Sequence, residues 1–231
     1  MKFGVVVFPG STCDQDMVHV LKNELNQEVI TLWHKDTDLS HMNKEDCIII
    51  PGGFSFGDYL RSGALASRSP LMDAIKDFAA KGGKVLGICN GFQILCEAEM
   101  LPGYLKQNES EKFHCHNVYL KGGEGENLIT NAMKGQVIEL PVAHADGRYV
   151  ASEEEIKQMK ENGQILFYYA TKDGEVTEEV NFNGATANIA GVCNAEKNVF
   201  GMMPHPERAA IKSMGSDQGR AILEALIKVV E

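Results

Sequence analysis

The sequence lacks the features that would place it in a membrane, in a disulfide-rich secreted domain or on nucleic acid. No apolar run approaches the roughly 20 residues that a membrane-spanning helix needs, and the apolar part of the N-terminal stretch is too short for a secretory signal. None of the six cysteines forms a C-x-x-C pair, so we expect reduced thiols and a cytoplasmic protein. Basic residues are scarce, since 22 Lys and Arg stand against 32 Asp and Glu, and the net charge of -10 argues against nucleic acid or acidic membranes as partners.

The sequence also lacks a Pro-, Ser- or Gly-rich linker and an internal repeat. We therefore predict a single domain over residues 1–231, which is long enough to bury a substantial core without disulfides or metal. Neither the phosphate-binding pattern G-x-x-x-x-G-K-[ST] nor the dinucleotide fingerprint occurs. The glycine-rich stretch 52–58 has neither the lysine nor the spacing of a phosphate loop, so we predict no nucleotide cofactor in this chain.

Short apolar runs alternate with amphipathic stretches in the first half of the chain. The apolar runs predict buried strands at 3–8, 29–33, 47–50 and 85–88. Helical spacing of apolar residues predicts helices within 17–25, 71–79 and 91–99. This alternation indicates an α/β fold with a parallel sheet covered on both faces. Ligands bind at the carboxyl ends of such strands, so the loops 51–58 and 89–91 should open on one edge.

The second half of the chain has a different pattern, with apolar segments separated by polar turns. We predict hairpin-like strands at 113–120, 137–142, 165–169 and 176–182. The charged segment 152–162 predicts a short surface helix. A last helix should dock on the sheet through one apolar face, formed by Ile222, Leu223, Leu226, Ile227 and Val230.

Residues 87–91 read G-I-C-N-G, and the serine version of this G-x-C-x-G pattern is the nucleophile elbow of α/β-hydrolases. A nucleophile on such a strained turn needs small neighbours, which explains a glycine on both sides of Cys89. The helix that follows directs its N-terminal partial positive charge at the sulfur and favours the reactive thiolate. The backbone N–H of Asn90 and an N–H from the Gly52–Gly53 pair are candidate oxyanion donors.

Each cysteine also has a structural interpretation. Cys89 alone fits a core cysteine after a buried strand, and core packing is the interpretation we favour for Cys47, Cys96 and Cys193. Cys13 follows a Pro-Gly-Ser turn, and its role stays open.

A cysteine nucleophile needs a histidine, and the histidine needs a group that orients it. His205 lies between two prolines, and Glu207 follows two residues later, on the same side of an extended segment. The alternative is a polar loop before the last helix. His114 and His116 flank Cys115, but no other Cys/His pair offers metal-ligand spacing, so we predict no metal site. His144 lies in a polar, glycine-containing loop that is either a binding surface or a solvated turn.

Together, these motifs resemble a known family. The sequence resembles the class I (triad) glutamine amidotransferases in its segments PGGFSFGDYLRSGALA, GKVLGICNGFQIL and GMMPHPER. More specifically, it resembles the glutaminase subunits of phosphoribosylformylglycinamidine synthase, which the segments FPGSTCDQD and PVAHADGRY also match. Two positions depart from that pattern, because Thr12 stands where Asn is expected and Asp146 where Glu is frequent. Neither position belongs to the triad.

The resemblance implies a flavodoxin-like three-layer αβα sandwich. It implies Cys89 as nucleophile, His205 as general base and acid, and Glu207 as the orienting carboxylate, with oxyanion donors at Gly53 and Asn90. Further candidates for substrate binding are Gly52, Gln93, His144 and Arg148. No metal site is implied.

The resemblance also implies a substrate and partners. L-Glutamine would be hydrolysed through a cysteine thioester, and the ammonia would pass to a large synthetase subunit in de novo purine biosynthesis. That subunit would bind ATP and Mg²⁺, and a small third subunit would complete the complex. Three alternatives remain open: an amidotransferase of another pathway, a related cysteine-elbow peptidase or deglycase, and a non-enzymatic flavodoxin-like interaction module. Peptidases and deglycases of this type often place histidine directly after the cysteine, where this chain has Asn90.

Overall fold

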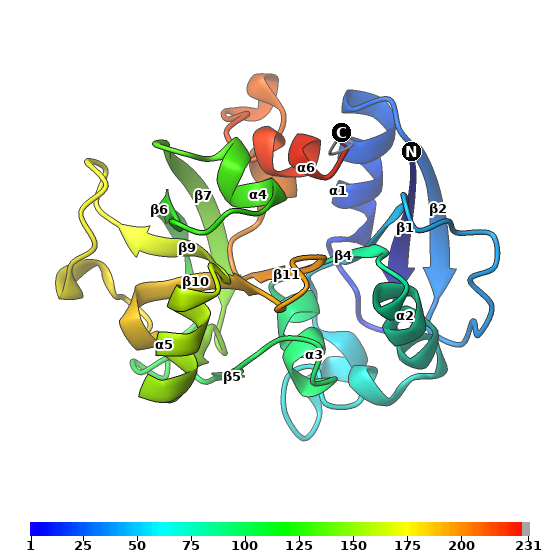
Figure 1. The fold of residues 1–231 in the computed structure, drawn as a ribbon, viewed down its shortest axis with the longest axis horizontal. Helices are drawn as coiled ribbons and strands as arrows, with labels where there is room; N and C mark the ends of the chain where they lie inside the picture. Colours follow the sequence, from blue (N-terminus) through cyan, green and yellow to red (C-terminus); the bar gives the residue numbers. More distant parts are fainter. Residues whose placement is uncertain (228–231) are drawn as a thin grey trace.

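The computed structural model describes residues 1–227 and has a nine-stranded sheet between two layers of helices (Figure 1). The strand order is β2-β1-β3-β4-β11-β10-β9-β6-β7. A separate two-stranded ribbon pairs β5 (Tyr104–Lys106) with β8 (Arg148–Val150). This arrangement confirms the predicted three-layer α/β architecture.

The first part of the sheet is parallel, as the sequence predicts. It contains β1 (Lys2–Val7), β2 (Glu28–Trp33), β3 (Cys47–Ile50), β4 (Lys84–Ile88) and β11 (Val199–Met202). All four residues of β3 and of β11 are buried, because helices cover both faces of the sheet there. The carboxyl ends of these strands form the edge where the sequence predicts a ligand site.

The second part of the sheet is antiparallel, which confirms the hairpin-like pattern. It contains β6 (His114–Gly122), β7 (Val137–His144), β9 (Ile165–Ala170) and β10 (Ile189–Cys193). Buried and partly exposed residues alternate along β7, the period of a strand with only one face in the core.

The predicted strand at 176–182 is wrong. This segment contains a single 3₁₀ turn, η4 (Glu178–Val180), and the strand in this region is β10 instead. Asparagine side chains satisfy the backbone here in place of a strand partner: Asn188 Nδ2 donates to the carbonyl of Thr177 (2.7 Å), and Asn181 Nδ2 donates to the carbonyl of Ala185 (2.9 Å). Apolar alternation alone did not reveal this competition.

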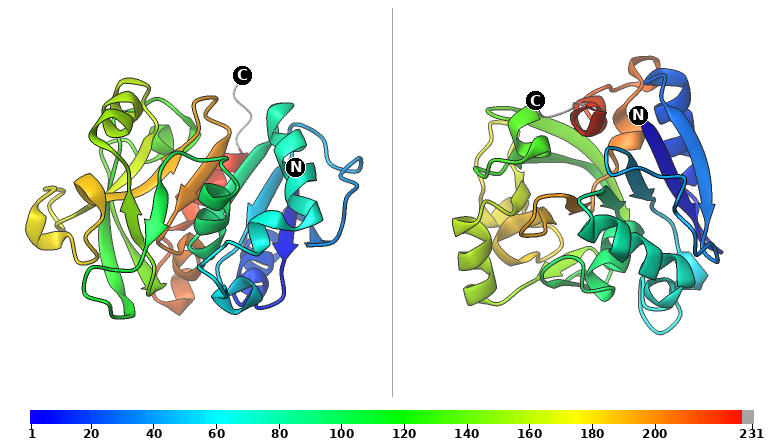
Figure 2. Two further views of the ribbon diagram at one scale, coloured as in Figure 1. Left: turned by 90° about the horizontal axis from the view of Figure 1, so that it is seen from below. Right: turned by 45° about the vertical axis from the view of Figure 1, so that its right-hand side comes forward.

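The helices are α1 (Asp14–His19), α2 (Pro70–Ala80), α3 (Asn90–Glu97), α4 (Leu128–Ala132), α5 (Glu153–Glu161) and α6 (Arg220–Ile227). A π-helical turn, η1 (Val20–Glu24), continues α1. Helices α2, α3 and α5 lie on one side of the sheet, and α1, α4 and α6 on the other (Figures 1 and 2). The sequence predicted all of these except α4. The polar helix α5 begins at a capping box in which Ser152 and Glu155 bond each other's backbone N–H.

The C-terminal helix docks as predicted. The side chains of Ile222, Leu223 and Leu226 are fully buried, and α6 packs against α4. Val230 of the predicted apolar face lies outside the described residues.

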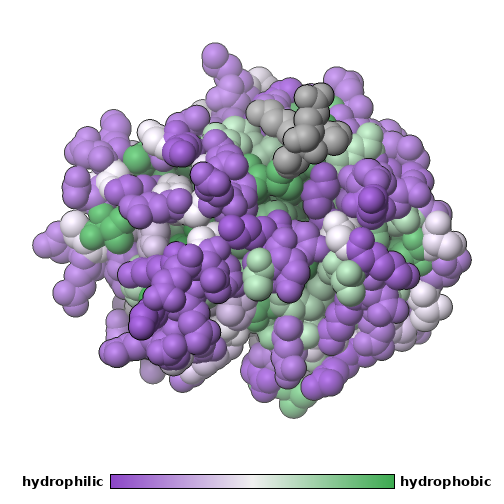
Figure 3. Space-filling model, viewed as in Figure 1, coloured by the Kyte–Doolittle hydropathy of each residue, from purple (hydrophilic) through white to green (hydrophobic). Residues whose placement is uncertain are grey.

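The face in Figure 3 is largely hydrophilic, with small apolar areas between the polar side chains. No helix within residues 1–227 combines the length and the apolar character needed to cross a bilayer.

Candidate active site

Cys89 occupies the sharp turn between β4 and α3, as the glycine spacing predicts. Its backbone has φ 51° and ψ -106°, a conformation that L-residues rarely adopt. A Cβ atom at Gly87 would lie 2.6 Å from the carbonyl oxygen of Gly91, and one at Gly91 would clash with the carbonyl of Ile50. The turn is therefore possible only with glycine at both positions.

His205 and Glu207 form a buried pair in the loop after β11. Nδ1 of His205 lies 2.6 Å from Oε1 of Glu207, and the two residues are only 2% and 4% exposed. The backbone N–H of His205 donates to the carbonyl of Pro141 (2.9 Å), which anchors this loop to β7. The carboxylate thus holds the imidazole in one orientation, and Nε2 has no hydrogen-bond partner among residues 1–227.

The sheet brings Cys89 and His205 together although they are far apart in the sequence. β4 and β11 are parallel neighbours, with Ile88 paired to Met202, so the two loops leave the same edge side by side. The N–H of Cys89 donates to the carbonyl of Met202 (2.8 Å). The predicted nucleophile, base and orienting carboxylate therefore lie at one place.

The electrostatics of this site favour a charged imidazole. Burial by itself lowers the pKa of His205, but the Glu207 carboxylate and the Cys89 thiol oppose this effect and hold the pKa well above its ordinary value. A positive charge beside a cysteine sulfur stabilises the thiolate, the nucleophilic form.

The candidate oxyanion donors lie at the same edge. The backbone N–H of Asn90 belongs to the first turn of α3, where N–H groups have no intrahelical acceptor. Gly53 has φ 145°, and a Cβ there would lie 2.7 Å from the backbone nitrogen of Thr12. At Gly52, a Cβ would lie 2.7 Å from Cε1 of His205. Both glycines allow the backbone to approach the site closely.

A pocket opens beside Cys89. Its walls come from the loop after β3, from α3 and from the end of β7, with the lining residues Gly53, Phe54, Asp58, Ser62, Cys89, Gln93, Ala143, His144, Ala145 and Asp146. It thus brings together four of the sequence-predicted residues, namely Gly53, Cys89, Gln93 and His144. The side chain of Asn90 lies directly behind Gln93, to whose Oε1 it donates (2.9 Å).

Arg148 does not line this pocket. Its Nε donates to the carbonyl of Gly184 (3.0 Å), and its guanidinium lies 3.7 Å from the Glu109 carboxylate. The His-Cys-His stretch also lies apart from the nucleophile. The rings of His114 and His116 are 5.6 Å apart and pack around Phe182.

Cys13, whose role the sequence pattern does not define, also lies in this region. Cys13 is buried, and its Sγ accepts a hydrogen bond from Arg208 Nη2 (3.1 Å). Cys13 also lies close to the His205–Glu207 pair, since one potential ligand atom from each of the three residues lies within 4.8 Å of the others. The guanidinium beside the sulfur indicates a hydrogen-bonded network at this position. The signal was present in the sequence, because Cys13 follows β1 at the same sheet edge.

Asp58 and Ser62 are pocket residues that no sequence pattern singles out. Both lie on the loop between β3 and α2, and their side chains reach the pocket only because that loop folds back over α3. The Arg61–Glu97 ion pair fastens the loop to α3, with Arg61 Nε 2.6 Å from the carboxylate.

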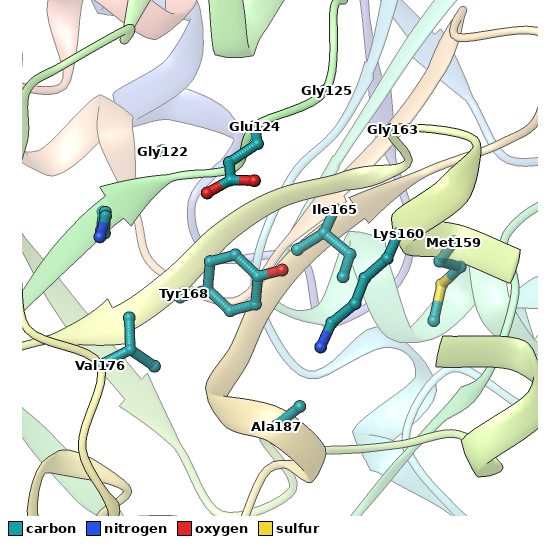
Figure 4. Close-up of a pocket in the computed structure, with 11 residues that line it drawn as sticks. Gly122, Glu124, Gly125, Met159, Lys160, Gly163, Ile165, Tyr168, Val176 and Ala187 are labelled. Atoms are coloured by element: carbon teal, nitrogen blue, oxygen red, sulfur yellow. The ribbon is translucent and has the colours of Figure 1, made fainter. Parts of the chain in front are cut away.

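A larger cavity, of about 390 Å³, lies elsewhere (Figure 4). It is bounded by the end of β6, by β9 and by α5, and the side chains of Glu124, Lys160 and Tyr168 surround it. None of the predicted site residues lines it, so the chemistry of the residues, and not cavity size, identifies the site at Cys89.

Comparisons with known proteins identify the family of this chain. Residues 1–221 match the CobB/CobQ-like glutamine amidotransferase domain. Among curated proteins, the phosphoribosylformylglycinamidine synthase subunits PurQ of Moorella thermoacetica and Aquifex aeolicus are 50% and 52% identical to this chain. Each alignment covers 98% of this chain, with 95% of the Moorella and 99% of the Aquifex protein.

Solved structures support the same assignment. A chain of the structure of PurLQS from Thermotoga maritima superposes with a TM-score of 0.83 at 38% identity, over 98% of this chain and 97% of that one. A glutamine amidotransferase from Thermotoga maritima, at 12% identity and a TM-score of 0.63 over 99% of both chains, shares the fold and confirms the flavodoxin-like class. The chain belongs to the CobB/CobQ-like glutamine amidotransferases and, within them, to the family of phosphoribosylformylglycinamidine synthase subunit PurQ.

Proposed function

We propose that this chain is the glutaminase subunit of a phosphoribosylformylglycinamidine synthase. It hydrolyses glutamine and supplies ammonia to a separate ATP-dependent synthetase subunit, which converts formylglycinamide ribonucleotide to formylglycinamidine ribonucleotide. The observation that carries the proposal is the meeting of Cys89 with the His205–Glu207 pair at one sheet edge. Family membership supplies the pathway.

The first half-reaction transfers the glutamyl group to the protein. The Cys89 thiolate attacks the side-chain amide carbon of glutamine, and the backbone N–H groups of Gly53 and Asn90 stabilise the oxyanion. Loss of one such donor lowers the rate by roughly a hundredfold to a thousandfold. His205 then donates its proton to the departing nitrogen, the C–N bond breaks, and a γ-glutamyl thioester remains on Cys89.

The second half-reaction restores the thiolate. His205, now neutral, accepts a proton from water, and the resulting hydroxide attacks the thioester carbonyl. The C–S bond breaks, glutamate leaves, and the imidazolium is ready for the next cycle. Glu207 holds the ring in one orientation through both steps and stabilises its charged form.

A partner is needed because ammonia released at neutral pH becomes ammonium, which is not a nucleophile. We propose that the chain functions in a complex with a large synthetase subunit that binds ATP and Mg²⁺ and with a small third subunit. A chain of the Thermotoga maritima PurLQS structure matches this one over nearly its whole length, which supports a role as one subunit of such an assembly. The six cysteines are free, which supports our placement of the complex in the cytoplasm.

The test is reconstitution with the synthetase and small subunits of the same organism. Wild-type complex should form formylglycinamidine ribonucleotide with either glutamine or ammonia as nitrogen source. Complex carrying Cys89→Ala should keep the ammonia reaction and lose the glutamine reaction, and Cys193→Ala, at a buried cysteine on β10, should keep both. Glutamine-dependent synthesis that persists in Cys89→Ala would contradict the proposal. A wild-type chain that confers no glutamine-dependent activity on the complex would do the same.

A further inference from the structure

The pocket beside Cys89 contains two carboxylates and no counter-ion. Asp58 comes from the loop after β3 and Asp146 from the turn after β7, and both line the same pocket as Cys89. Neither forms an ion pair with any residue in 1–227, although eight other such pairs occur there. None of the residues that line the pocket is a lysine or an arginine.

Neutral groups hold the two carboxylates in place. Ser62 Oγ donates to Asp146 Oδ2 (2.6 Å), and Asn90 Nδ2 donates to Asp58 Oδ1 (3.2 Å). Gln93 Nε2 donates to the backbone carbonyl of Asp146 (2.6 Å), which ties this turn to α3. These contacts fix the positions of both acidic side chains but do not neutralise their charge.

The arrangement is electrostatically unfavourable in the free protein. Burial and the neighbouring Asp146 charge raise the pKa of Asp58 to about 6. His144, the one basic side chain among the lining residues, cannot offset this negative charge, because burial and the nearby histidines lower its pKa to about 3. A cation bound beside these two neighbouring acidic groups would relieve the unfavourable charge in this partly buried pocket.

The same pocket also contains a buried polar atom without a hydrogen-bond partner. The side chain of His144 is 97% buried, since its exposed fraction is 3%, and its Nε2 has no hydrogen-bond partner among the described residues. Its Nδ1 is already paired with Asn108 Oδ1 (3.1 Å). An unpartnered polar atom at this depth points to a ligand in the pocket, independently of the two carboxylates.

We propose that Asp58 and Asp146 bind the α-ammonium group of the substrate glutamine and make the pocket selective for a free α-amino acid. This inference rests on the proposed function, which places the glutamine side-chain amide at Cys89. The α-ammonium lies at the other end of the same short molecule, and the acidic pair lines the same pocket as Cys89. An anionic or neutral acyl amide that lacks the ammonium leaves both carboxylates unpaired and is excluded.

The experiment compares two substrates in the assembled synthase. L-Glutamine is measured against glutaramate, which has the same amide and carboxylate but no α-amino group. Wild-type complex should prefer glutamine strongly in kcat/KM. Asp58→Asn and Asp146→Asn should each lower kcat/KM for glutamine by roughly tenfold to a hundredfold, mainly through KM, because a charge-assisted hydrogen bond is lost. Neither variant should lower kcat/KM for glutaramate.

The matched control is Asp77→Asn, at an exposed aspartate on α2. Asp77→Asn should leave kcat/KM for both substrates unchanged, and the rate of ammonia-dependent synthesis should be the same in every variant. An equal loss for glutamine and glutaramate in Asp58→Asn and Asp146→Asn would overturn the inference while leaving the glutaminase function in place. A wild-type complex that uses ammonia but never glutamine would overturn the proposed function, and this inference with it.

Discussion

Nδ1 of His205 and Oε1 of Glu207 lie 2.6 Å apart in a site from which water is almost fully excluded. The backbone of His205 is extended and lies between two prolines, and the imidazole ring is buried. The Glu207 carboxylate therefore determines both the orientation and the charge of the ring. This relationship makes Glu207 the residue through which the reactivity of His205 is most directly tested.

Replacing Glu207 by glutamine should lower kcat of glutamine hydrolysis in the assembled complex by about a hundredfold to ten-thousandfold. The amide can still contact the ring, but it no longer stabilises the imidazolium. Without the carboxylate, the pKa of His205 should fall, and the titration of this ring followed by NMR should move to lower pH. A variant with unchanged kcat and an unchanged His205 titration would contradict this role.

The same variant has a predicted effect on stability. A histidine whose native pKa exceeds its ordinary value of 6.5 contributes stability that is fully present below pH 6.5 and is lost as pH rises through the native pKa. The difference in unfolding free energy between wild type and Glu207→Gln should therefore be largest near pH 6 and shrink toward pH 9. Urea unfolding at both pH values measures it, and a difference that grows with pH would count against this coupling.

The turn at Cys89 makes a separate prediction about the backbone. At φ 51° and ψ -106°, any side chain strains the chain, so Cys89→Gly should be more stable than Cys89→Ala by about 1 kcal/mol or more. Both variants lack the thiol, so the comparison isolates the strain. At Cys193, inside β10, the order should reverse, because glycine weakens a strand by about 0.5–1 kcal/mol relative to alanine. Chemical denaturation of the four variants gives both differences, and the same order at both positions would contradict a strained turn.

The turn and the triad were predictable from the sequence for definite physical reasons. Glycines on both sides of Cys89, at the end of a buried strand, indicate a sharp turn that leaves no room for neighbouring side chains. Parallel strands place the loops that follow them at one edge of the sheet. The sequence therefore predicted which segments meet. It also predicted most strands, because fully buried strands are uniformly apolar.

The features that the sequence did not predict depend on tertiary contacts, which no local sequence pattern encodes. Asp58 enters the pocket because its loop folds over α3, and Arg148 lies outside because Glu109 and the carbonyl of Gly184 engage its guanidinium. The segment 176–182 has strand-like alternation, but Asn188 bonds its Thr177 carbonyl, and its own Asn181 side chain bonds the carbonyl of Ala185. Such side-chain partners are set by tertiary packing.

Gly52 provides a test of how closely the backbone must approach His205. Its φ is not in the left-handed region, so Gly52→Ala should act only through its new methyl group, which would lie 2.7 Å from Cε1 of His205 and 3.1 Å from Sγ of Cys13. The ring must shift, and kcat should fall at least tenfold. The control is Gly82→Ala, where φ is 90° but no atom lies within 4 Å, so stability should fall without loss of kcat. Kinetics and thermal unfolding of both variants separate the two effects, and full activity in Gly52→Ala would contradict the predicted contact.

The acidic pair in the pocket should reduce stability in the absence of substrate. Asp58 has a native pKa of about 6 against an ordinary 3.8, so the native protein binds an extra proton between these values. The stability gained from that proton is present at low pH and is lost as pH rises through 6. Burial and the charge of the neighbouring Asp146 disfavour the ionised form of Asp58, and the hydrogen bond from Asn90 only partly offsets this effect.

Asp58→Asn, which cannot ionise, should therefore be more stable than wild type at pH 8, and the gap should close between pH 6 and pH 4. Thermal unfolding without ligand measures the gap, and Asp77→Asn should show no such pH dependence. Added glutamine should stabilise wild type more than Asp58→Asn, because at a given concentration a ligand that binds the native state more tightly stabilises it more. If Asp58→Asn were instead less stable than wild type at pH 8, the Asp58 carboxylate would already have a stabilising partner within the free protein. This result would contradict an unpaired carboxylate that binds a cation.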